Sequence, residues 1–231
     1  GLGDVYKRQP GIQVLSNSGN ATLAIQNADV TAEVGGYDNG VTVQAGSASS
    51  GGHTAKLEVN GGSLTATGGS SSDFGIYFYC PSSSNINLNV SNNAIVRANG
   101  GIASGDNEDE PVTPSGTGIV FNNKVGTVYG NVTLQEDLTI GEGESLTLAE
   151  NASLSAGGHN VIVDGGTVDD SIKTSLGESV KYPPDITTTT LSSGTVNQSY
   201  TAQLSATGSD TIKWSLATGS SLPSNPVSYT H

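Results

Sequence analysis

Carboxylates are the residues of this sequence with the greatest capacity for chemistry, and they are concentrated in two places. One is the acidic stretch Asp106–Glu110, and the other is the adjacent pair Asp169-Asp170 in GGTVDDS. Glycosidases need two carboxylates that face each other across a groove, and calcium sites need several oxygen ligands. The acidic stretch lacks the glycine and the spacing of an EF-hand loop, so we interpret it as a solvated bulge between strands. Strong turn formers surround the pair, which indicates a solvated turn.

Other catalytic residue types are sparse. His53 and His159 occur in SGGHT and AGGHN, without the second glycine of the Gly-His-Gly element found in pectin-cleaving hydrolases. Cys80, the single cysteine, ends the stretch GIYFYC on the same face as Ile76 and Phe78, which predicts a buried thiol. No histidine lies near it in sequence to activate it. The basic residues after position 9 are Lys56, Arg97, Lys124, Lys173, Lys181 and Lys213. None of them is near a carboxylate cluster in sequence, so no catalytic constellation, metal site or cofactor is predicted.

The stretch DFGIYFYC is the candidate ligand-binding site. Strict alternation places Ile76 and Phe78 inward, which sends Tyr77 and Tyr79 outward on the same strand. Two neighbouring phenol rings suit the flat faces of sugar rings, and Asp73 just before the strand can accept a hydrogen bond from a sugar hydroxyl. The alternative is that the two rings cover the core beneath a loop such as CPSSSN.

Composition limits the partners of the chain. Its 21 Asp and Glu residues outnumber 8 Lys and Arg residues, which leaves a formal net charge of −13. A chain this acidic has no basic patch that could displace counterions, so nucleic acids and anionic membrane surfaces are excluded as partners. No run of residues is apolar enough to predict membrane insertion. Gly, Ser, Thr and Asn dominate over good helix formers, which predicts an all-β fold.

Strands that must position these residues recur at a fixed period. LAIQNADVTA begins at Leu23, LEVNGGSLTA at Leu57 and LNVSNNAIVRA at Leu88, so the starts are 34 and 31 residues apart. Alternation predicts the inward residues Leu23, Ile25, Leu57, Val59, Leu88 and Val90, with Val30, Leu64 and Ile95 at the equivalent eighth positions. It sends Ala24, Glu58 and Asn89 outward. Asn and Gly at the equivalent turns can stack or adopt a left-handed backbone conformation.

A second family of short segments interleaves with the first: GVTV from Gly40, GIYF from Gly75 and GIVF from Gly118. We expect these three segments to stack as neighbouring strands. The counterparts of Tyr77 and Tyr79 are then Thr42 and Gln44 in the first segment and Val120 and Asn122 in the third.

The two families together predict a solenoid over residues 10–180. No single repeat can bury its apolar side alone, whereas stacked repeats share one continuous core. A right-handed parallel β-helix fits best, and a repeated antiparallel β-sandwich is the alternative. From Gly130 the period shortens, with Leu138, Leu146 and Leu154 eight residues apart. This resembles the run of short strands that closes β-helical regions in bacterial cell-surface proteins.

Beyond the repeats, KYPPD at Lys181–Asp185 predicts an extended linker, because two successive prolines favour one. Residues 186–225 resemble the N-terminal part of a bacterial immunoglobulin-like domain of the kind found in tandem on surface proteins. The resemblance rests on ITT at Ile186–Thr188, Leu191, Gly194, Val196, Tyr200, Leu204, ATG at Ala206–Gly208, WSL at Trp214–Leu216, Gly219 and Leu222–Pro223. It implies a partial β-sandwich, because the later strands of such a domain do not follow.

The two ends of the chain have a different character. DVYKRQ near the start and VSYTH at the end can be translated from one short DNA segment in opposite orientations. That segment resembles the transposon-end adaptor used in sequencing. We therefore expect residues 1–9 and 226–231 to be adaptor-derived and to contribute nothing to folding.

The function predicted from these patterns is that of a non-catalytic bacterial cell-surface or secreted protein. It resembles repetitive, adhesin-like surface proteins, which implies an extracellular stalk that binds glycans or proteins. The alternative is an extracellular polysaccharide lyase or glycosidase that uses a groove of the β-helix. Stacked acidic side chains on adjacent turns favour the enzyme, and a Ser/Thr/Asn surface favours the stalk.

Overall fold

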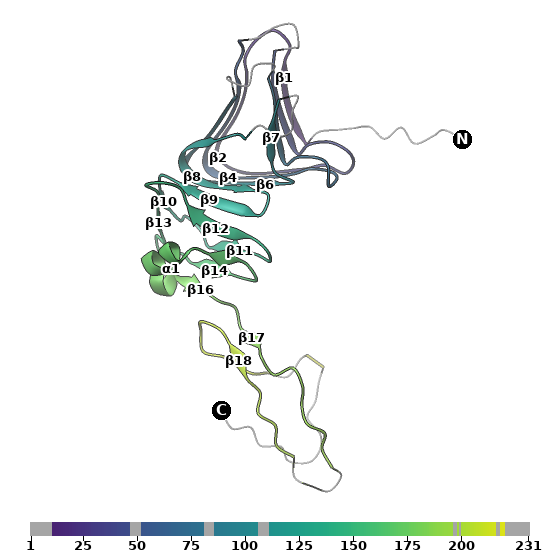
Figure 1. Ribbon diagram of the computed structural model, residues 1–231, viewed down its shortest axis with the longest axis vertical. Coiled ribbons are helices and arrows are strands. Elements are labelled where there is room, and N and C mark those ends of the chain that lie inside the picture. Colours follow the sequence, from purple (N-terminus) through teal and green to yellow (C-terminus); the bar gives the residue numbers. More distant parts are fainter. Residues whose placement is uncertain are drawn as a thin grey trace, which may run out of the picture. The chain divides into compact units, whose positions relative to one another are not determined.

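The structure is a computed structural model that describes residues 11–46, 52–80, 86–105, 111–195, 198, 200–215 and 218–219. The terminal segments 1–9 and 226–231 and the acidic stretch Asp106–Glu110 lie outside these residues. The described part is mostly β-strand, as the composition predicts. It forms two compact units, Gly1–Val180 and Lys181–His231 (Figure 1). The division falls at the start of the predicted linker.

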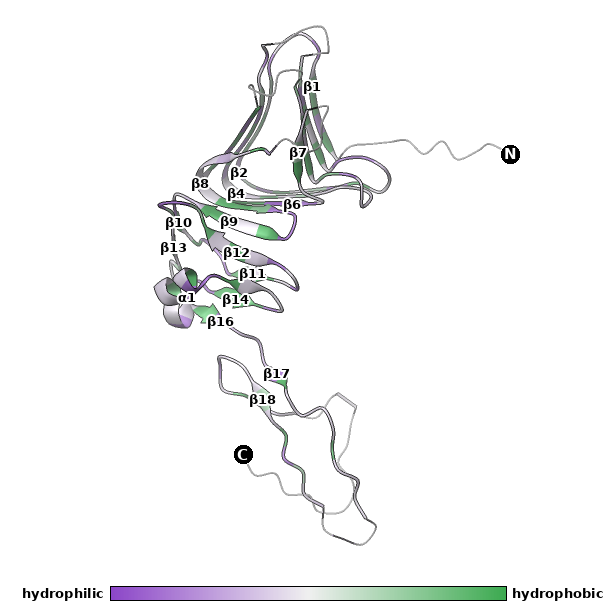
Figure 2. Ribbon diagram, viewed as in Figure 1, coloured by the Kyte–Doolittle hydropathy of each residue, from purple (hydrophilic) through white to green (hydrophobic). Residues whose placement is uncertain are grey.

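Three long strands carry the first repeat family. They are β2 (Ala21–Glu33), β4 (Ala55–Thr67) and β6 (Ile86–Asn99), and they pair in parallel, whereas the alternative β-sandwich requires antiparallel pairs. Leu23, Leu57 and Leu88 are direct neighbours across the three strands. Apolar and polar residues alternate along the strands of this unit (Figure 2).

The eighth position of the third repeat is one residue later than predicted. Leu64 pairs with Val96, not with Ile95, because the register between β4 and β6 shifts after Asn60. Val96 is therefore buried, and Ile95 lies on the opposite, outward face. The repeat LNVSNNAIVRA has one residue more than the other two, and this extra residue is accommodated at the bend of the strand.

Each long strand bends in its middle at residues with positive φ. Asn27, Gly61, Gly62, Asn92 and Asn93 have φ between 48° and 70° at equivalent places in the three strands. The predicted left-handed conformation of these Asn and Gly residues is confirmed. Stacking also occurs, since the Asn92 side-chain amide donates a hydrogen bond to Asn60 Oδ1.

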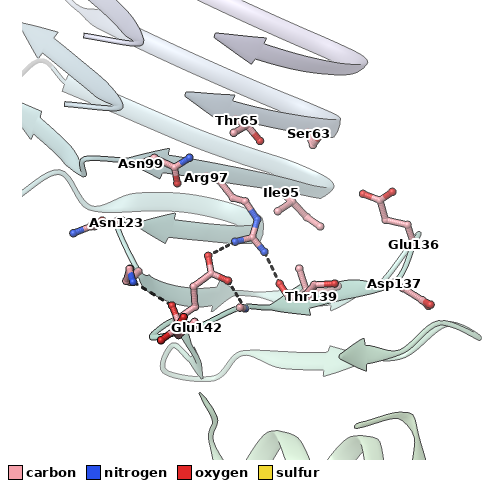
Figure 3. A pocket seen from close by; sticks show the side chains of 14 residues that line it. Ser63, Thr65, Ile95, Arg97, Asn99, Asn123, Glu136, Asp137, Thr139 and Glu142 are labelled. Carbon is pink, nitrogen blue, oxygen red and sulfur yellow. Dashed lines mark hydrogen bonds and ion pairs between the residues drawn. The ribbon is translucent and has the colours of Figure 1, made fainter. Parts of the chain in front are cut away.

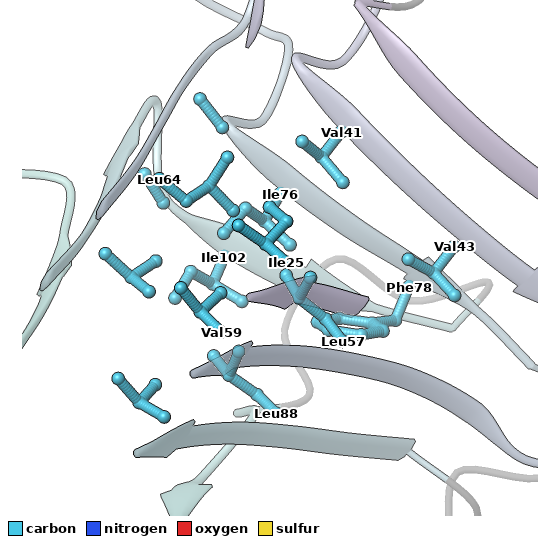
Figure 4. Close-up of a cluster of buried hydrophobic side chains, with 14 of the residues drawn as sticks. Ile25, Val41, Val43, Leu57, Val59, Leu64, Ile76, Phe78, Leu88 and Ile102 are labelled. Carbon is cyan, nitrogen blue, oxygen red and sulfur yellow. The ribbon is translucent and has the colours of Figure 1, made fainter. Parts of the chain in front are cut away.

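Four short strands form a second parallel sheet. They are β1 (Ile12–Ser16), β3 (Val41–Ala45), β5 (Ile76–Tyr79) and β7 (Ile102–Ser104), in that order. The inward side chains of the long and short strands form the first core, which Figure 4 shows. All six predicted inward residues belong to the first core or pack against it.

The third segment of the second repeat family does not join this sheet. GIVF lies in β8 (Pro114–Asn122), which pairs with β6, while β7 is the neighbour of β5. Ala103, not Val120, is therefore opposite Tyr77. The physical reason is that Gly101-Ile102 already provides the next short strand, so the chain has completed that turn before it reaches Gly118.

In β8 the core changes to the other face of the sheet. Residues 118–121 are all buried, whereas β4 and β6 alternate between buried and half-buried positions. Val120 belongs to the first core, and Ile119 and Phe121 belong to a second core on the opposite face. After a tight turn, β9 (Val125–Tyr129) pairs with β8 in antiparallel orientation.

Strands from three sheets enclose the second core. β12 (Ser145–Leu148) and β15 (Thr167–Val168) follow β9 at the end of the seven-stranded sheet β15-β12-β9-β8-β6-β4-β2. β10 (Asn131–Thr133) pairs with β13 (Ser153–Ser155), and β11 (Leu138–Ile140) is followed by β14 (Val161–Val163) and β16 (Val180–Lys181). Leu138, Leu146 and Leu154 are buried in this core and come from three different sheets. The predicted spacing of eight residues is therefore the separation in sequence between one sheet and the next.

A short helix adjoins the end of the second core. α1 (Asp170–Leu176) is followed by a 3-10 turn at Gly177–Ser179, and it buries Ile172 and Leu176. The predicted turn at Asp169-Asp170 is thus the beginning of a helix, with Asp169 as its N-cap residue and Asp170 in its first turn. Both carboxylates are exposed, as expected.

The second unit has little regular structure among its described residues. β17 (Asp185–Ile186) and β18 (Ala206–Thr207) form one short antiparallel pair. Ile186, Leu191 and Trp214 remain 60%, 56% and 39% exposed. Isolated two-stranded hairpins are at best marginally stable in water. The described residues of this unit therefore provide no covering strands of the kind found in an immunoglobulin-like sandwich.

We expect residues 185–225 to be unfolded when they are produced alone. Trp214 is the only tryptophan of the chain, so its fluorescence should show a solvent-like emission maximum and no cooperative change on heating. Intact chain measured under the same conditions is the control. A blue-shifted emission with a cooperative melting transition would show that this segment folds by itself.

Candidate functional site

A groove lies on the first unit beside β4, β6 and the turns around β11 (Figure 3). Ile95, which lines it, is partly buried and packs against the second core. The groove encloses about 700 Å³. Its lining residues are Ser63, Thr65, Ile95, Arg97, Asn99, Asn123, Lys124, Glu136, Asp137, Leu138, Thr139, Gly141, Glu142 and Glu144.

The floor of the groove follows from strand alternation. Thr65 and Arg97 are register partners on β4 and β6, and Ser63 and Ile95 are partners two residues earlier. Their strand neighbours point into the first core, so these four side chains point away from it. The one-residue register shift after Asn60 is what puts Ile95 and Arg97, and not Val96, on this face.

Arg97 is held in one orientation by three contacts. Its guanidinium donates from Nη1 to Glu144 Oε1 at 2.5 Å and from Nη2 to the carbonyl oxygen of Thr139 at 2.8 Å. Its Cζ atom lies 3.9 Å from the centre of the Phe121 ring, within the range of a cation–π contact. These contacts connect β6 of the first core with the β11–β12 turn of the second.

The carboxylates that line the groove differ in the hydrogen bonds that they accept. Glu144 Oε2 also accepts a hydrogen bond from the Gly141 backbone N–H at 2.8 Å, so both of its oxygens are used. Asp137 Oδ1 accepts from the Asn160 backbone N–H at 2.8 Å. In the part of the chain that the structure describes, Glu136 has no hydrogen-bond or ion-pair partner.

Lys124 is the second cation of the groove, and its Nζ donates to the carbonyl oxygen of Glu142 at 3.1 Å. The groove therefore combines two cations and four carboxylates with hydroxyl and amide groups. This arrangement can donate and accept many hydrogen bonds in directions that the sheet and the turns fix. Such a site is suited to recognition of a polar ligand.

The predicted binding residues lie elsewhere on the first unit. Tyr77 and Tyr79 alternate with buried Ile76 and Phe78, as predicted, and both are half-buried. The Tyr77 hydroxyl donates to the carbonyl oxygen of Gly105, and its ring stacks on Phe74 with centroids 6.0 Å apart. The Tyr77 hydroxyl is thus already engaged within the protein.

Asp73 lies in the turn before β5. Its Oδ2 accepts a hydrogen bond from Ser70 Oγ at 2.5 Å, which stabilises that turn. Thr42, next to Tyr77 on β3, is 7% exposed, and Ala103 on its other side is 1% exposed.

Two groups with shifted pKa values lie outside the groove. The hydrogen bond from Lys173 and the positive charge of that residue lower the pKa of Asp170. Burial raises the pKa of Tyr129, an effect that a hydrogen bond with Thr127 partly offsets. The pair Asp169-Asp170 is thus engaged at the start of α1.

The Cys80 thiol is buried, as predicted, and donates to the carbonyl oxygen of His53 at 3.1 Å.

The groove was not found from the sequence because its residues come from distant segments. Arg97 and Glu144 are 47 residues apart, the first on β6 and the second in the turn before β12. One signal was present: Arg97 is a lone cation at an outward strand position, between the inward residues Val96 and Ala98. A long cationic side chain at such a position commonly has a carboxylate partner.

Comparison with protein-family models, curated proteins and solved structures gives no match for this chain. Within the described ranges, no three His, Cys, Asp or Glu side chains are grouped to hold a metal ion. No helix in the described ranges has the length and apolarity needed to span a membrane.

Proposed function

We propose that the chain serves as a non-catalytic stalk with adhesive capacity in a bacterial cell-surface or secreted protein. In this proposal unit 1 is a right-handed parallel β-helix that presents binding surfaces. Residues 186–225 are the beginning of an immunoglobulin-like spacer domain, after a linker at 181–185. The partners are extracellular glycans or proteins.

Rows of small polar side chains on the outward faces carry this proposal. Hydroxyl, amide and carboxylate side chains of neighbouring strands hydrogen-bond to one another. The pairs are Ser63 with Asp29, Asn92 with Asn60, Asn99 with Thr67, Asn89 with Ser115 and Ser153 with Asn131. These groups connect turns to one another, which is the use expected in an extended scaffold.

The alternative is an extracellular polysaccharide lyase or glycosidase, and the four carboxylates of the groove are the observation that favours it. A general acid must exchange a proton with its substrate. Glu144 already accepts hydrogen bonds with both oxygens, from Arg97 and from Gly141. Asp137 is engaged with the backbone of Asn160. These contacts engage two of the four carboxylates within the protein, which supports a binding role over catalysis for Glu144 and Asp137.

The proposal is tested on a glycan array with wild-type chain and a Tyr77→Ala/Tyr79→Ala double variant. We expect the wild type to bind at least one extracellular glycan and the variant to bind it more weakly, because the exposed part of the phenol rings is lost. Incubation with the bound glycan should release no new reducing ends. Equal binding by the variant to every glycan that the wild type binds would exclude the tyrosine face, and product release would favour the enzyme.

A further inference from the structure

The groove between β6 and the β11–β12 turn has the size and chemistry of a saccharide site. Its volume of about 700 Å³ falls within the range of small-ligand sites in proteins. We propose that this groove binds a neutral oligosaccharide. This inference rests on the adhesive function proposed above and adds to it a second site and a class of ligand. It is independent of the tyrosine face.

Arg97 provides fixed hydrogen-bond donors on the floor of the groove. A guanidinium has five N–H donors, and the contacts with Glu144 and Thr139 use one on each terminal nitrogen. Among the described residues, no atom accepts a hydrogen bond from the other N–H groups of Arg97. Stacking on Phe121 holds the guanidinium plane in place. A ligand oxygen can therefore bind there without the entropy loss of ordering a free side chain.

Glu136 provides an acceptor at another point of the groove. It lies on the side of Ile95 and Asp137, away from Asn123 (Figure 3). Its carboxylate is exposed and has no partner in the described part of the chain. Hydrogen bonds from hydroxyls to ionised carboxylates are stronger than those between neutral groups. Thr65, the register partner of Arg97 on β4, adds a hydroxyl to the floor of the groove, so donors and acceptors are distributed over it.

Charge disfavours acidic ligands in the groove. Glu136, Asp137, Glu142 and Glu144 outnumber Arg97 and Lys124 around the groove, and the whole chain has a net charge of −13. Uronate and phosphate groups are therefore repelled. The hydroxyls of a neutral sugar can donate to the carboxylates and accept from the guanidinium. This combination matches the lining better than an acidic polysaccharide does.

Isothermal titration calorimetry of the intact chain tests the proposal with cellohexaose, mannohexaose and N-acetylchitohexaose. We expect at least one of these neutral hexasaccharides to bind, and hexagalacturonate and pentalysine not to bind. Absence of binding by all three neutral probes would overturn the proposal. Binding of pentalysine alone would also overturn it, because the groove would then be a site for cationic peptides.

Two matched variants place the binding in the groove. Glu136→Gln keeps the shape of the side chain but removes its charge, and we expect it to weaken binding by about fivefold to tenfold. Glu136 is exposed and no described residue pairs with it, so the variant should fold normally, as circular dichroism can verify. Glu150→Gln, an exposed carboxylate outside the groove, should bind like the wild type.

The tyrosine double variant separates the two proposals. We expect it to bind the neutral hexasaccharide with unchanged affinity, because Tyr77 and Tyr79 do not line the groove. If the Glu136→Gln variant binds as tightly as the wild type and the tyrosine double variant loses binding, the groove is not the site. In that case the adhesive function still stands on the tyrosine face.

Discussion

Phe121→Ala is expected to lower the free energy of unfolding of the first unit by about 3–5 kcal/mol, the range for removal of a buried phenylalanine ring. Phe121 is fully buried in the second core, at the strand where the core changes faces. Its ring also supports Arg97 and lies against Gly126, where an added Cβ would be 2.5 Å from a ring carbon. Loss of the ring leaves a cavity and removes the support of the Arg97 side chain.

Urea denaturation followed by far-UV circular dichroism measures this effect, since the single tryptophan lies in the other unit. Val125→Ala on the neighbouring strand is the control, because Val125 is 55% exposed and should cost little. A loss below about 1 kcal/mol for Phe121→Ala would contradict the assignment of Phe121 to a tightly packed core.

The close contact with Gly126 gives an independent check on the same ring. Gly126→Ala should destabilise the wild-type chain, because the new methyl group overlaps the ring. In a Phe121→Leu background the same change should cost much less. A double-mutant cycle would thus show a favourable coupling energy between the two positions.

Gly62→Ala is the second substitution with a large expected effect, about 2–4 kcal/mol of destabilisation from backbone strain and overlap combined. Gly62 has a φ of 70° at the bend of β4. An added Cβ there would be 2.3 Å from the carbonyl oxygen of Ala28 on β2. That oxygen is backbone within a paired strand, so it cannot move aside without breaking the register.

Gly158→Ala is the matched control for the bend. Gly158 also has positive φ, 94°, but an added Cβ would have no atom within 4 Å. Only the strain of the left-handed conformation remains, about 1–2 kcal/mol. The same urea denaturation compares both variants. Equal losses would show that the contact between the stacked bends is looser than the structure indicates.

Local periodicity was sufficient to predict the first core. Leu23, Leu57 and Leu88 recur with the spacing of one turn, and they pair directly. The same approach misplaced Ile95 by one residue, because a pattern of spacings does not reveal where a strand absorbs an extra residue. It also assigned the segment GIVF to the sheet of short strands, because its first residues resemble theirs. In the structure β7 occupies that place in the sheet.

The site was less predictable than the core. Strand alternation correctly placed Tyr77 and Tyr79 outward, but their accessibility depends on neighbours such as Phe74 and Gly105. The groove depends on the change of faces in β8, which requires both sides of one strand to be buried. Residues 118–121 are Gly-Ile-Val-Phe, a continuous apolar run, and such runs indicate strands that are buried on both sides.

The position of the groove has a consequence for how this protein can change in evolution. The groove draws on β4, β6 and the residues that follow, and nothing from β1 to β3 lines it. Among the described residues, β1 and β2 stand at the ends of their sheets, where β1 pairs with β3 and β2 pairs with β4. Duplication or loss of a whole turn before β4 would lengthen or shorten the protein and leave the groove intact. Length and ligand recognition can therefore be selected separately in such a chain.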